Sequence, residues 1–322
     1  MKTISKKYLA LFMLVALVLF NACEKEEEVV VTPVSISYTS LDTYWETKAP
    51  TAESFIFTAQ NGTTFTTKNG SVVTIPSNAL ITSSGLPVSG SVSVKMKEIF
   101  TKSEMMYSGI LPVSYGNVLN SGGEFFIQAT QNGNALRVAD NMLVEVEIPA
   151  QAIANNMQLF FAEPIEEPDT MNWVQVDPWF PQDSLGSSFG FNAVDSTYEI
   201  DLDTLTWCNI DAFIYPISYF NCTFNLTGIT GLDGSNTKAV AFFKNQNSAW
   251  NVGVSGWGSI VNDVISETHL ADVPLNLVVI SVVDGDLYSG VLDITPQSNQ
   301  VYSIAMSITT SDDLDQLILS LP

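Results

Sequence analysis

The sequence predicts an all-β protein, built as two tandem β-sandwich domains, the second immunoglobulin-like, behind a short N-terminal leader. Three observations carry this prediction. Short β-branched and aromatic runs alternate apolar and polar residues, turn-forming pairs separate these runs at regular spacing, and no sustained helical period follows Val34. We expect the leader at residues 1–22, an acidic tether at 23–50, a first sandwich at 51–216 and a second at 217–322.

The leader has the three parts of a secretory signal. Lys2, Lys6 and Lys7 precede an apolar run over residues 8–20, and small residues lead to Cys23. The run is shorter than the roughly 20 apolar residues that span a bilayer, so we expect it to be cleaved. An ordinary secretory signal that happens to contain a cysteine is the alternative.

Ala22 and Cys23 give this segment a resemblance to the lipobox of bacterial lipoproteins, although Phe20 stands where leucine is usual. The resemblance implies that Cys23 is diacylated and becomes the first residue of the mature chain. The acidic run Glu24–Glu28 cannot pack and is expected to act as a tether. It is also similar to the export signal of Bacteroidota surface lipoproteins, which implies an outer-membrane location facing the cell exterior.

Alternation and turns define the first sandwich. Every second residue is apolar in 91–96 and in 143–148, as expected for a sheet with one buried and one solvent-exposed face. Asn69-Gly70 and Asn132-Gly133 separate β-rich runs, and such pairs favour the positive φ angles of hairpin turns. Regular spacing of strands and turns favours a sandwich.

Residues 55–150 resemble a known module. The segments 61–80, 88–90, 105–110 and Gly123-Glu124-Phe125 look like a β-sandwich module of Bacteroidota surface lipoproteins, similar in turn to the domain of zonula-occludens, ankyrin and netrin-receptor proteins. The resemblance implies a binding or assembly module. The later segment 207–213, Trp-Cys-Asn-Ile-Asp-Ala-Phe, looks like a tryptophan, asparagine, cysteine and aspartate motif of the same lipoproteins.

A Pro- and Asp-rich stretch at 163–190 is predicted to form an arm with a long loop. In and beyond it, four Asp-Ser/Thr triplets resemble the O-glycosylation sequon of Bacteroidota. Chance matches are common for so short a motif. The candidate acceptors are Thr170, Ser184, Ser196 and Thr204.

The last hundred residues again show strand patterns, which suggest the second, immunoglobulin-like sandwich. Strands are expected at 218–227, 239–243, 275–283 and 301–308. Asp284-Gly285-Asp286 is a strong turn sequence between two of them. The acidic segment 312–315 fits either a short helix or a strand.

The chain contains three cysteines. With Cys23 assigned to the anchor, Cys208 and Cys222 remain, and an even remainder in an oxidising compartment predicts a disulfide. Two buried free thiols are the alternative.

Charge narrows the choice of partners. The chain holds 34 acidic against 12 basic residues, a net charge of −22, and the cleaved leader removes three of the lysines. Nucleic acids and anionic headgroups attract clustered Lys and Arg, so neither is an expected partner. The acyl anchor is therefore the predicted contact with outer-membrane lipid.

Catalytic patterns are scarce. His269 is the single histidine, so a histidine-based zinc site is excluded, and no Gly-x-Ser-x-Gly elbow or phosphate-binding glycine loop occurs. Paired carboxylates stay open, because 34 acids allow many geometries. Asp201-Leu202-Asp203 and Asp284-Gly285-Asp286 could hold calcium, but solvated turns are the better interpretation. We expect no catalytic residue, metal or cofactor.

The expected function is that of a surface-exposed outer-membrane lipoprotein, a non-catalytic binding or assembly module and accessory subunit of an outer-membrane complex with protein partners. One alternative is a carbohydrate-binding accessory of a glycan-uptake system, for which exposed Trp or Tyr on one face would be the discriminating observation. A carboxylate-pair glycoside hydrolase is the other.

Overall fold

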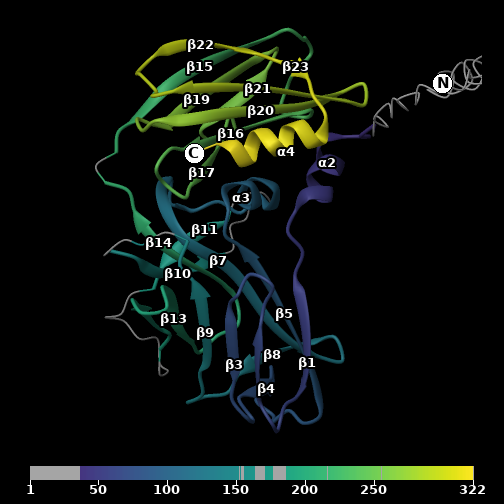
Figure 1. Cartoon of the computed structure of the whole chain (residues 1–322), viewed down its shortest axis with the longest axis vertical. Helices are drawn as coiled ribbons and strands as arrows, with labels where there is room; N and C mark the ends of the chain where they lie inside the picture. Colours follow the sequence, from purple (N-terminus) through teal and green to yellow (C-terminus); the bar gives the residue numbers. More distant parts are fainter. Residues whose placement is uncertain are drawn as a thin grey trace, which may run out of the picture. The chain divides into compact units, whose positions relative to one another are not determined.

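The computed structural model describes residues 37–151, 153, 156–163, 171–176, 186–215, 217–254 and 256–321. The leader, Cys23, the acidic run, Thr170 and Ser184 lie outside these residues. The described part belongs to one compact unit that begins at Ser37, and it is built mainly from strands in four sheets (Figure 1). The predicted all-β fold is therefore confirmed.

Two sheets form the N-terminal part of this unit. The nine-stranded sheet has the order β1-β5-β7-β14-β10-β11, with β4, β6 and β8 attached beside this path, and the five-stranded sheet has the order β12-β13-β9-β3-β2. Their strands are β1 (Glu53–Thr58), β2 (Thr63–Thr66), β3 (Val72–Ile75), β4 (Leu80–Thr82), β5 (Ser91–Ile99), β6 (Val113–Ser114), β7 (Asn117–Gln131), β8 (Asn134–Val138), β9 (Val144–Pro149), β10 (Gln158–Glu163), β11 (Asn172–Gln175), β12 (Ser188–Asn192), β13 (Thr197–Leu202) and β14 (Trp207–Phe213).

Two more sheets form the C-terminal part, in the orders β18-β19-β15-β22 and β17-β16-β20-β21-β23. β15 and β22 pair in parallel. The strands are β15 (Tyr219–Thr227), β16 (Thr237–Phe243), β17 (Ala249–Val252), β18 (Gly258–Val261), β19 (Val264–Ala271), β20 (Leu275–Val283), β21 (Asp286–Ile294), β22 (Gln300–Ala305) and β23 (Ser307–Ile308). No described sheet mixes strands from before and after residue 216. The division into two domains and the immunoglobulin type stay predictions.

The alternating sequences bury one face of each strand, because successive side chains point to opposite sides of a sheet. β5 and β9 follow the expected alternation, and residues such as Val94 and Val146 meet in the first core. A second core forms between the C-terminal sheets around Phe224 and Leu277. A third cluster joins the two parts, and it includes Phe160 and Val278.

The predicted turns are confirmed. Asn132 and Gly133 have φ angles of 51° and 82° between β7 and β8, and Asp284 and Gly285 have 52° and 89° between β20 and β21. Positive φ at both central residues matches the right-handed twist of a two-residue hairpin. Asn69-Gly70 lies in the turn between β2 and β3.

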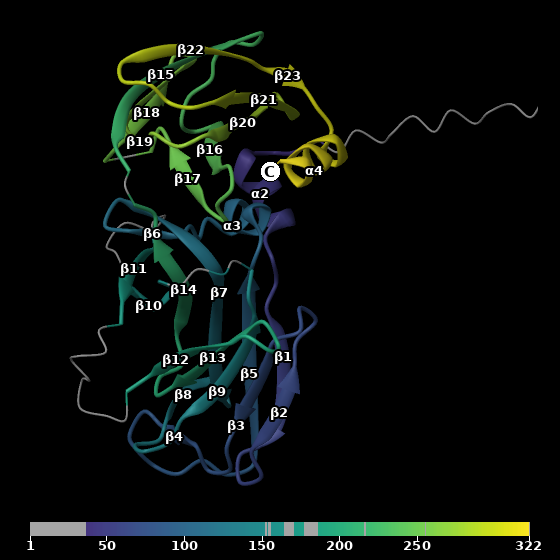
Figure 2. The same cartoon turned by 60° about the vertical axis from the view of Figure 1, so that its left-hand side comes forward.

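The described residues contain three helices that periodicity did not predict, although a short helix was one of two options at 312–315. They are α2 (Leu41–Lys48), α3 (Lys102–Ser108) and α4 (Ser311–Ser320). α2 lies within the predicted tether, yet it buries Leu41, Tyr44 and Trp45, so the packed structure begins before residue 51. In Figures 1 and 2, α4 lies against the sheet of β16 and β20, where Leu314 and Ile318 are buried in the third cluster. Within the described residues, no helix is long and apolar enough to cross a membrane.

Candidate functional site

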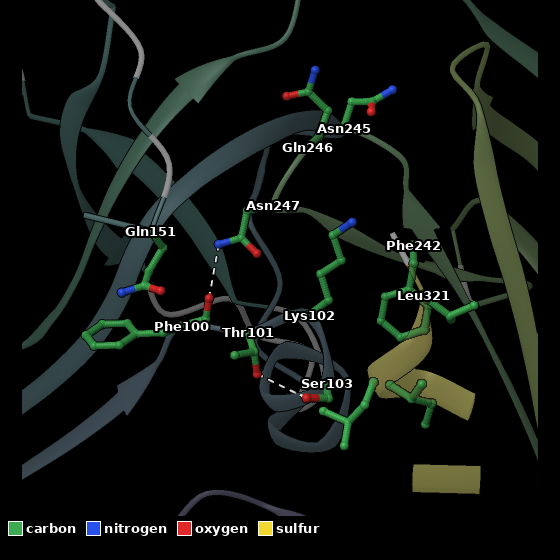
Figure 3. Close-up of a pocket in the computed structure, with 12 residues that line it drawn as sticks. Phe100, Thr101, Lys102, Ser103, Gln151, Phe242, Asn245, Gln246, Asn247 and Leu321 are labelled. Atoms are coloured by element: carbon green, nitrogen blue, oxygen red, sulfur yellow. Dashed lines mark hydrogen bonds between the residues drawn. The ribbon is translucent and has the colours of Figure 1, made fainter. Parts of the chain in front are cut away.

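A cavity with a volume of about 480 Å³ lies where the start of α3, the β16–β17 turn and the end of α4 meet (Figure 3). We call it the amide pocket, because amide side chains are its commonest polar group. Its lining residues are Phe100, Thr101, Lys102, Ser103, Gln151, Phe242, Asn245, Gln246, Asn247, Ile318, Leu319 and Leu321. The volume is in the range of small-ligand sites.

Asn247 fixes the wall of the amide pocket. Its Nδ2 group donates to the carbonyl oxygens of Phe100 at 3.1 Å and Ser121 at 3.0 Å, and its backbone N–H donates to Asn120 Oδ1 at 2.8 Å. The first of these bonds is drawn in Figure 3. One side chain thereby ties the β16–β17 turn to β7, so the wall is held by the tertiary fold.

Lys102 is the only cationic lining residue, and its Nζ donates to the carbonyl oxygen of Phe243 at 2.6 Å. Burial lowers the pKa of Lys102 to about 8. The lining contains no carboxylate, imidazole or thiol side chain. Apart from Lys102, its polar groups are amides and hydroxyls, which are suited to hydrogen bonding and do not titrate near neutral pH.

A buried acid cluster lies behind this wall, on β7 and β14. The strands pair so that Glu124 is opposite Asn209, and a bulge after Ile210 brings Asp211 opposite Ser121. Ser121 Oγ donates to Asn209 Oδ1 at 3.2 Å, and Asn209 Nδ2 donates to Asp211 Oδ2 at 2.6 Å. The backbone N–H of Ser121 donates to the carbonyl oxygen of Asn247 at 2.9 Å, which links the cluster to the amide pocket.

Both carboxyl groups of this cluster are fully buried, and neither Glu124 oxygen nor Asp211 Oδ1 has a hydrogen-bond partner. Burial, together with the charge of Asp211, raises the pKa of Glu124 well above its usual value. Burial likewise raises the pKa of Asp211. Neither residue lines the amide pocket, so the pair does not present a carboxylate to a ligand there.

An aromatic column lies in the C-terminal part and contacts the β6–β7 turn of the N-terminal part. The His269 ring stacks on Tyr219, with ring centroids 3.8 Å apart and planes at 10°, and on Trp257 at 4.2 Å and 29°. His269 Nε2 lies 3.0 Å from the carbonyl oxygen of Gly116, in the β6–β7 turn. Burial lowers the pKa of His269. The neutral imidazole is thereby favoured, which suits a ring held between two aromatic faces.

The predicted disulfide is absent from the structure, in which Cys208 and Cys222 are free and buried. Strand alternation turns Cys208 into the first core and Cys222 into the core of the C-terminal sheets. The two thiols also make different contacts, since Cys208 Sγ donates to the Thr206 carbonyl oxygen at 3.8 Å and Cys222 Sγ to that of Gln297 at 3.6 Å. An even count of cysteines gave no information about which core each would enter.

The other candidate residues lie apart. Ser196 is exposed in the turn before β13, and Thr204 is half-buried after it, so their glycosylation stays a prediction. Asp201 and Asp203 accept hydrogen bonds from Ser188 and Ser187, each at 2.7 Å. Among the described residues, no group of three or more His, Cys, Asp or Glu side chains is placed to hold a metal ion.

The sequence indicated no role for His269 and did not reveal the acid cluster. The sequence did contain a hint of the cluster. Glu124 belongs to one of the segments that carry the family resemblance, and Asn209 and Asp211 belong to another. Only the pairing of β7 with β14 shows that these two segments meet. Exposure separates Trp257, which is 39% exposed, from Trp173 and Trp250, which are buried.

Comparison with known proteins gives no match. No family model, no curated protein and no solved structure is similar to this chain at a significant level.

Proposed function

We propose that this protein is an exported lipoprotein, anchored through Cys23 in the outer membrane and facing the cell exterior, where it acts as a non-catalytic binding or assembly module. As such it serves as an accessory subunit of an outer-membrane complex. The observation that supports binding best is the amide pocket, whose polar lining consists of amides, hydroxyls and one lysine. Apart from Lys102, these groups do not titrate near neutral pH, and they are suited to recognising a partner by hydrogen bonds.

The anchor is tested by metabolic labelling with an alkyne fatty acid. Wild-type protein is expected to incorporate the label, and Cys23→Ala is expected to lose it. Protease added to whole cells should then degrade the wild-type protein if it faces the exterior. Equal labelling of the two proteins, or full protection from protease, would contradict these parts of the proposal.

The pocket is tested by changing its rim without touching the core. Leu319 lines the pocket and is 69% exposed, while Leu86 is 63% exposed and is not among the lining residues. Affinity purification from the native membrane is expected to recover stoichiometric partners with wild-type protein and with the control Leu86→Asp. Leu319→Asp places a carboxylate at the pocket and is expected to lose them. Equal recovery with all three proteins would contradict a role of the pocket.

A further inference from the structure

Trp257 combines exposure with a rigid support. Its indole is 39% exposed, although one of its faces is stacked on the imidazole of His269, which is in turn stacked on Tyr219. Trp250 lies behind, with ring centroids 6.4 Å from Trp257 and 5.8 Å from His269. The exposed ring is therefore supported by His269 and Trp250, and His269 is itself supported by Tyr219.

The backbone of Trp257 is equally fixed. Its N–H donates to the carbonyl oxygen of Val254 at 3.2 Å, and its own carbonyl oxygen accepts the N–H of Thr268 at 2.8 Å. Gly116 of the β6–β7 turn approaches so closely that a Cβ there would lie 3.1 Å from the indole and 3.6 Å from His269 Nε2. Figure 2 shows this turn beside β18 and β19. A side chain held in this way loses little entropy when a ligand binds.

A second exposed aromatic residue stands on the neighbouring turn. Tyr115 is 68% exposed, and its hydroxyl donates to Glu163 Oε2 at 2.8 Å. Its backbone N–H donates to Asn172 Oδ1 at 2.6 Å, and Asn172 Nδ2 reaches the same Glu163 oxygen at 3.4 Å. The Tyr115 ring is thereby tied down, with carboxylate and amide groups at its rim. Asn251 adds another amide in the small cavity that it shares with Trp257.

We infer that Trp257 and Tyr115 form a binding face for a neutral glycan. A sugar ring presents apolar C–H groups on its face and hydroxyl groups at its edge, which match a rigid aromatic surface rimmed by carboxylate and amide groups. The negative net charge of −22 disfavours acidic polysaccharides. This inference deepens the proposed binding function by naming a ligand class, and none of its residues lines the amide pocket.

The inference is tested by affinity electrophoresis of the full mature chain in gels that contain β-glucan, mannan, xylan or galactan, with polygalacturonic acid as the acidic contrast. At least one neutral polysaccharide is expected to retard the wild-type protein. Isothermal titration with that polysaccharide then gives the dissociation constant. Trp257→Ala is expected to weaken binding at least about tenfold and Tyr115→Ala about threefold, since aromatic contacts dominate such surfaces.

Phe191→Ala is the matched control. Phe191 is 40% exposed, as much as Trp257, but it lies on β12 in the five-stranded sheet of the N-terminal part. It is expected to bind like wild type. Trp257→Phe, which keeps an aromatic ring, is expected to recover part of the affinity lost in Trp257→Ala, and thermal melting shows whether each variant is folded. Retardation by no neutral polysaccharide, equal retardation by polygalacturonic acid, or equal affinity of wild type and folded Trp257→Ala would overturn the inference.

The two proposals fail separately. If Leu319→Asp loses its membrane partners while no neutral polysaccharide binds, the amide pocket retains its role and the glycan face is wrong. If instead wild-type protein captures a protein partner in stoichiometric amount and Trp257→Ala loses it, the face recognises protein and the glycan inference is overturned.

Discussion

Each part of the molecule buries a glutamate, and the two carboxyl groups have opposite surroundings. Glu267 on β19 is 1% exposed, and its oxygens accept backbone N–H groups from Gly253 at 2.9 Å, Thr268 at 3.0 Å and His269 at 2.9 Å. Glu124 on β7 is fully buried, and neither of its oxygens has a partner. The same side chain is thus satisfied in one sheet and unsatisfied in the other.

The difference shows that burial alone does not fix the charge of an acid. Burial raises the pKa of Glu267, but its three backbone bonds oppose that shift, because they stabilise the carboxylate. Nothing opposes the rise in the pKa of Glu124, where Asp211 adds to it. The Gly253 donor also depends on the absence of a side chain, since its φ is 75° and a Cβ would lie 2.8 Å from Ile260. The backbone of the Glu267 site is therefore shaped to hold a charge.

Removing Glu267 is expected to have the largest effect. Glu267→Leu leaves three backbone N–H groups without their acceptor, and each buried unpaired donor costs about 1–3 kcal/mol. We expect the free energy of unfolding in urea to fall by about 3 kcal/mol or more. Glu145→Leu, at an exposed position on β9, is the control and should stay within about 0.5 kcal/mol of wild type. A similar small loss for both variants would show that the backbone bonds contribute little.

Substitution of Glu124 is expected to change the unfolding free energy in the opposite direction. Glu124→Gln removes an acid whose ionised form is strongly penalised, and it keeps a similar shape. At pH 7 the unfolding free energy should rise, because burial and the charge of Asp211 disfavour the ionised form of Glu124 in the folded protein. Glu267→Gln, which places an amide N–H₂ against backbone donors, should instead lose stability. Destabilisation of both variants would show that Glu124 is ionised and has a partner.

The stabilisation by Glu124→Gln should depend on pH. The folded-state pKa of Glu124 lies above its unfolded value, so the folded protein binds the proton more tightly and the wild-type residue costs stability as pH rises above about 4.5. The difference in unfolding free energy between Glu124→Gln and wild type should therefore be smallest near pH 4 and increase toward pH 7, by at most about 1.4 kcal/mol per pH unit. Because both proteins contain His269, its titration cancels in this difference in unfolding free energy. A difference that is constant with pH would exclude a raised pKa.

The smallest effect is expected from a reductant, because the two parts share no disulfide. Cys208 and Cys222 are free thiols in separate cores. Dithiothreitol should shift the melting temperature of the mature chain by less than about 1 °C, whereas loss of a native disulfide costs roughly 2–5 kcal/mol. Alkylation under denaturing conditions without reductant should modify both thiols. A mass in which neither thiol is alkylated would show that the two cysteines form a disulfide.

The sequence predicted most of the local structure correctly. Alternation at 91–96 falls within β5, that at 143–148 begins one residue before β9, and the Asn132-Gly133 and Asp284-Gly285 pairs form the two-residue turns expected of them. These features depend on neighbours within a few residues, so a local pattern contains the needed information. The helix α2 was missed because it is short and buries three side chains against distant parts of the chain.

By itself, the sequence determined the all-β class, the turns and the acidic charge of the protein. Tertiary structure alone decided which polar groups meet, because pairings such as Glu124 with Asn209 and Tyr219 with His269 join residues far apart in the chain. It also decided which core each cysteine enters and which tryptophan reaches the surface. The physical reason is that strand periodicity fixes which side chains share a face, whereas sheet order and packing fix what that face contacts.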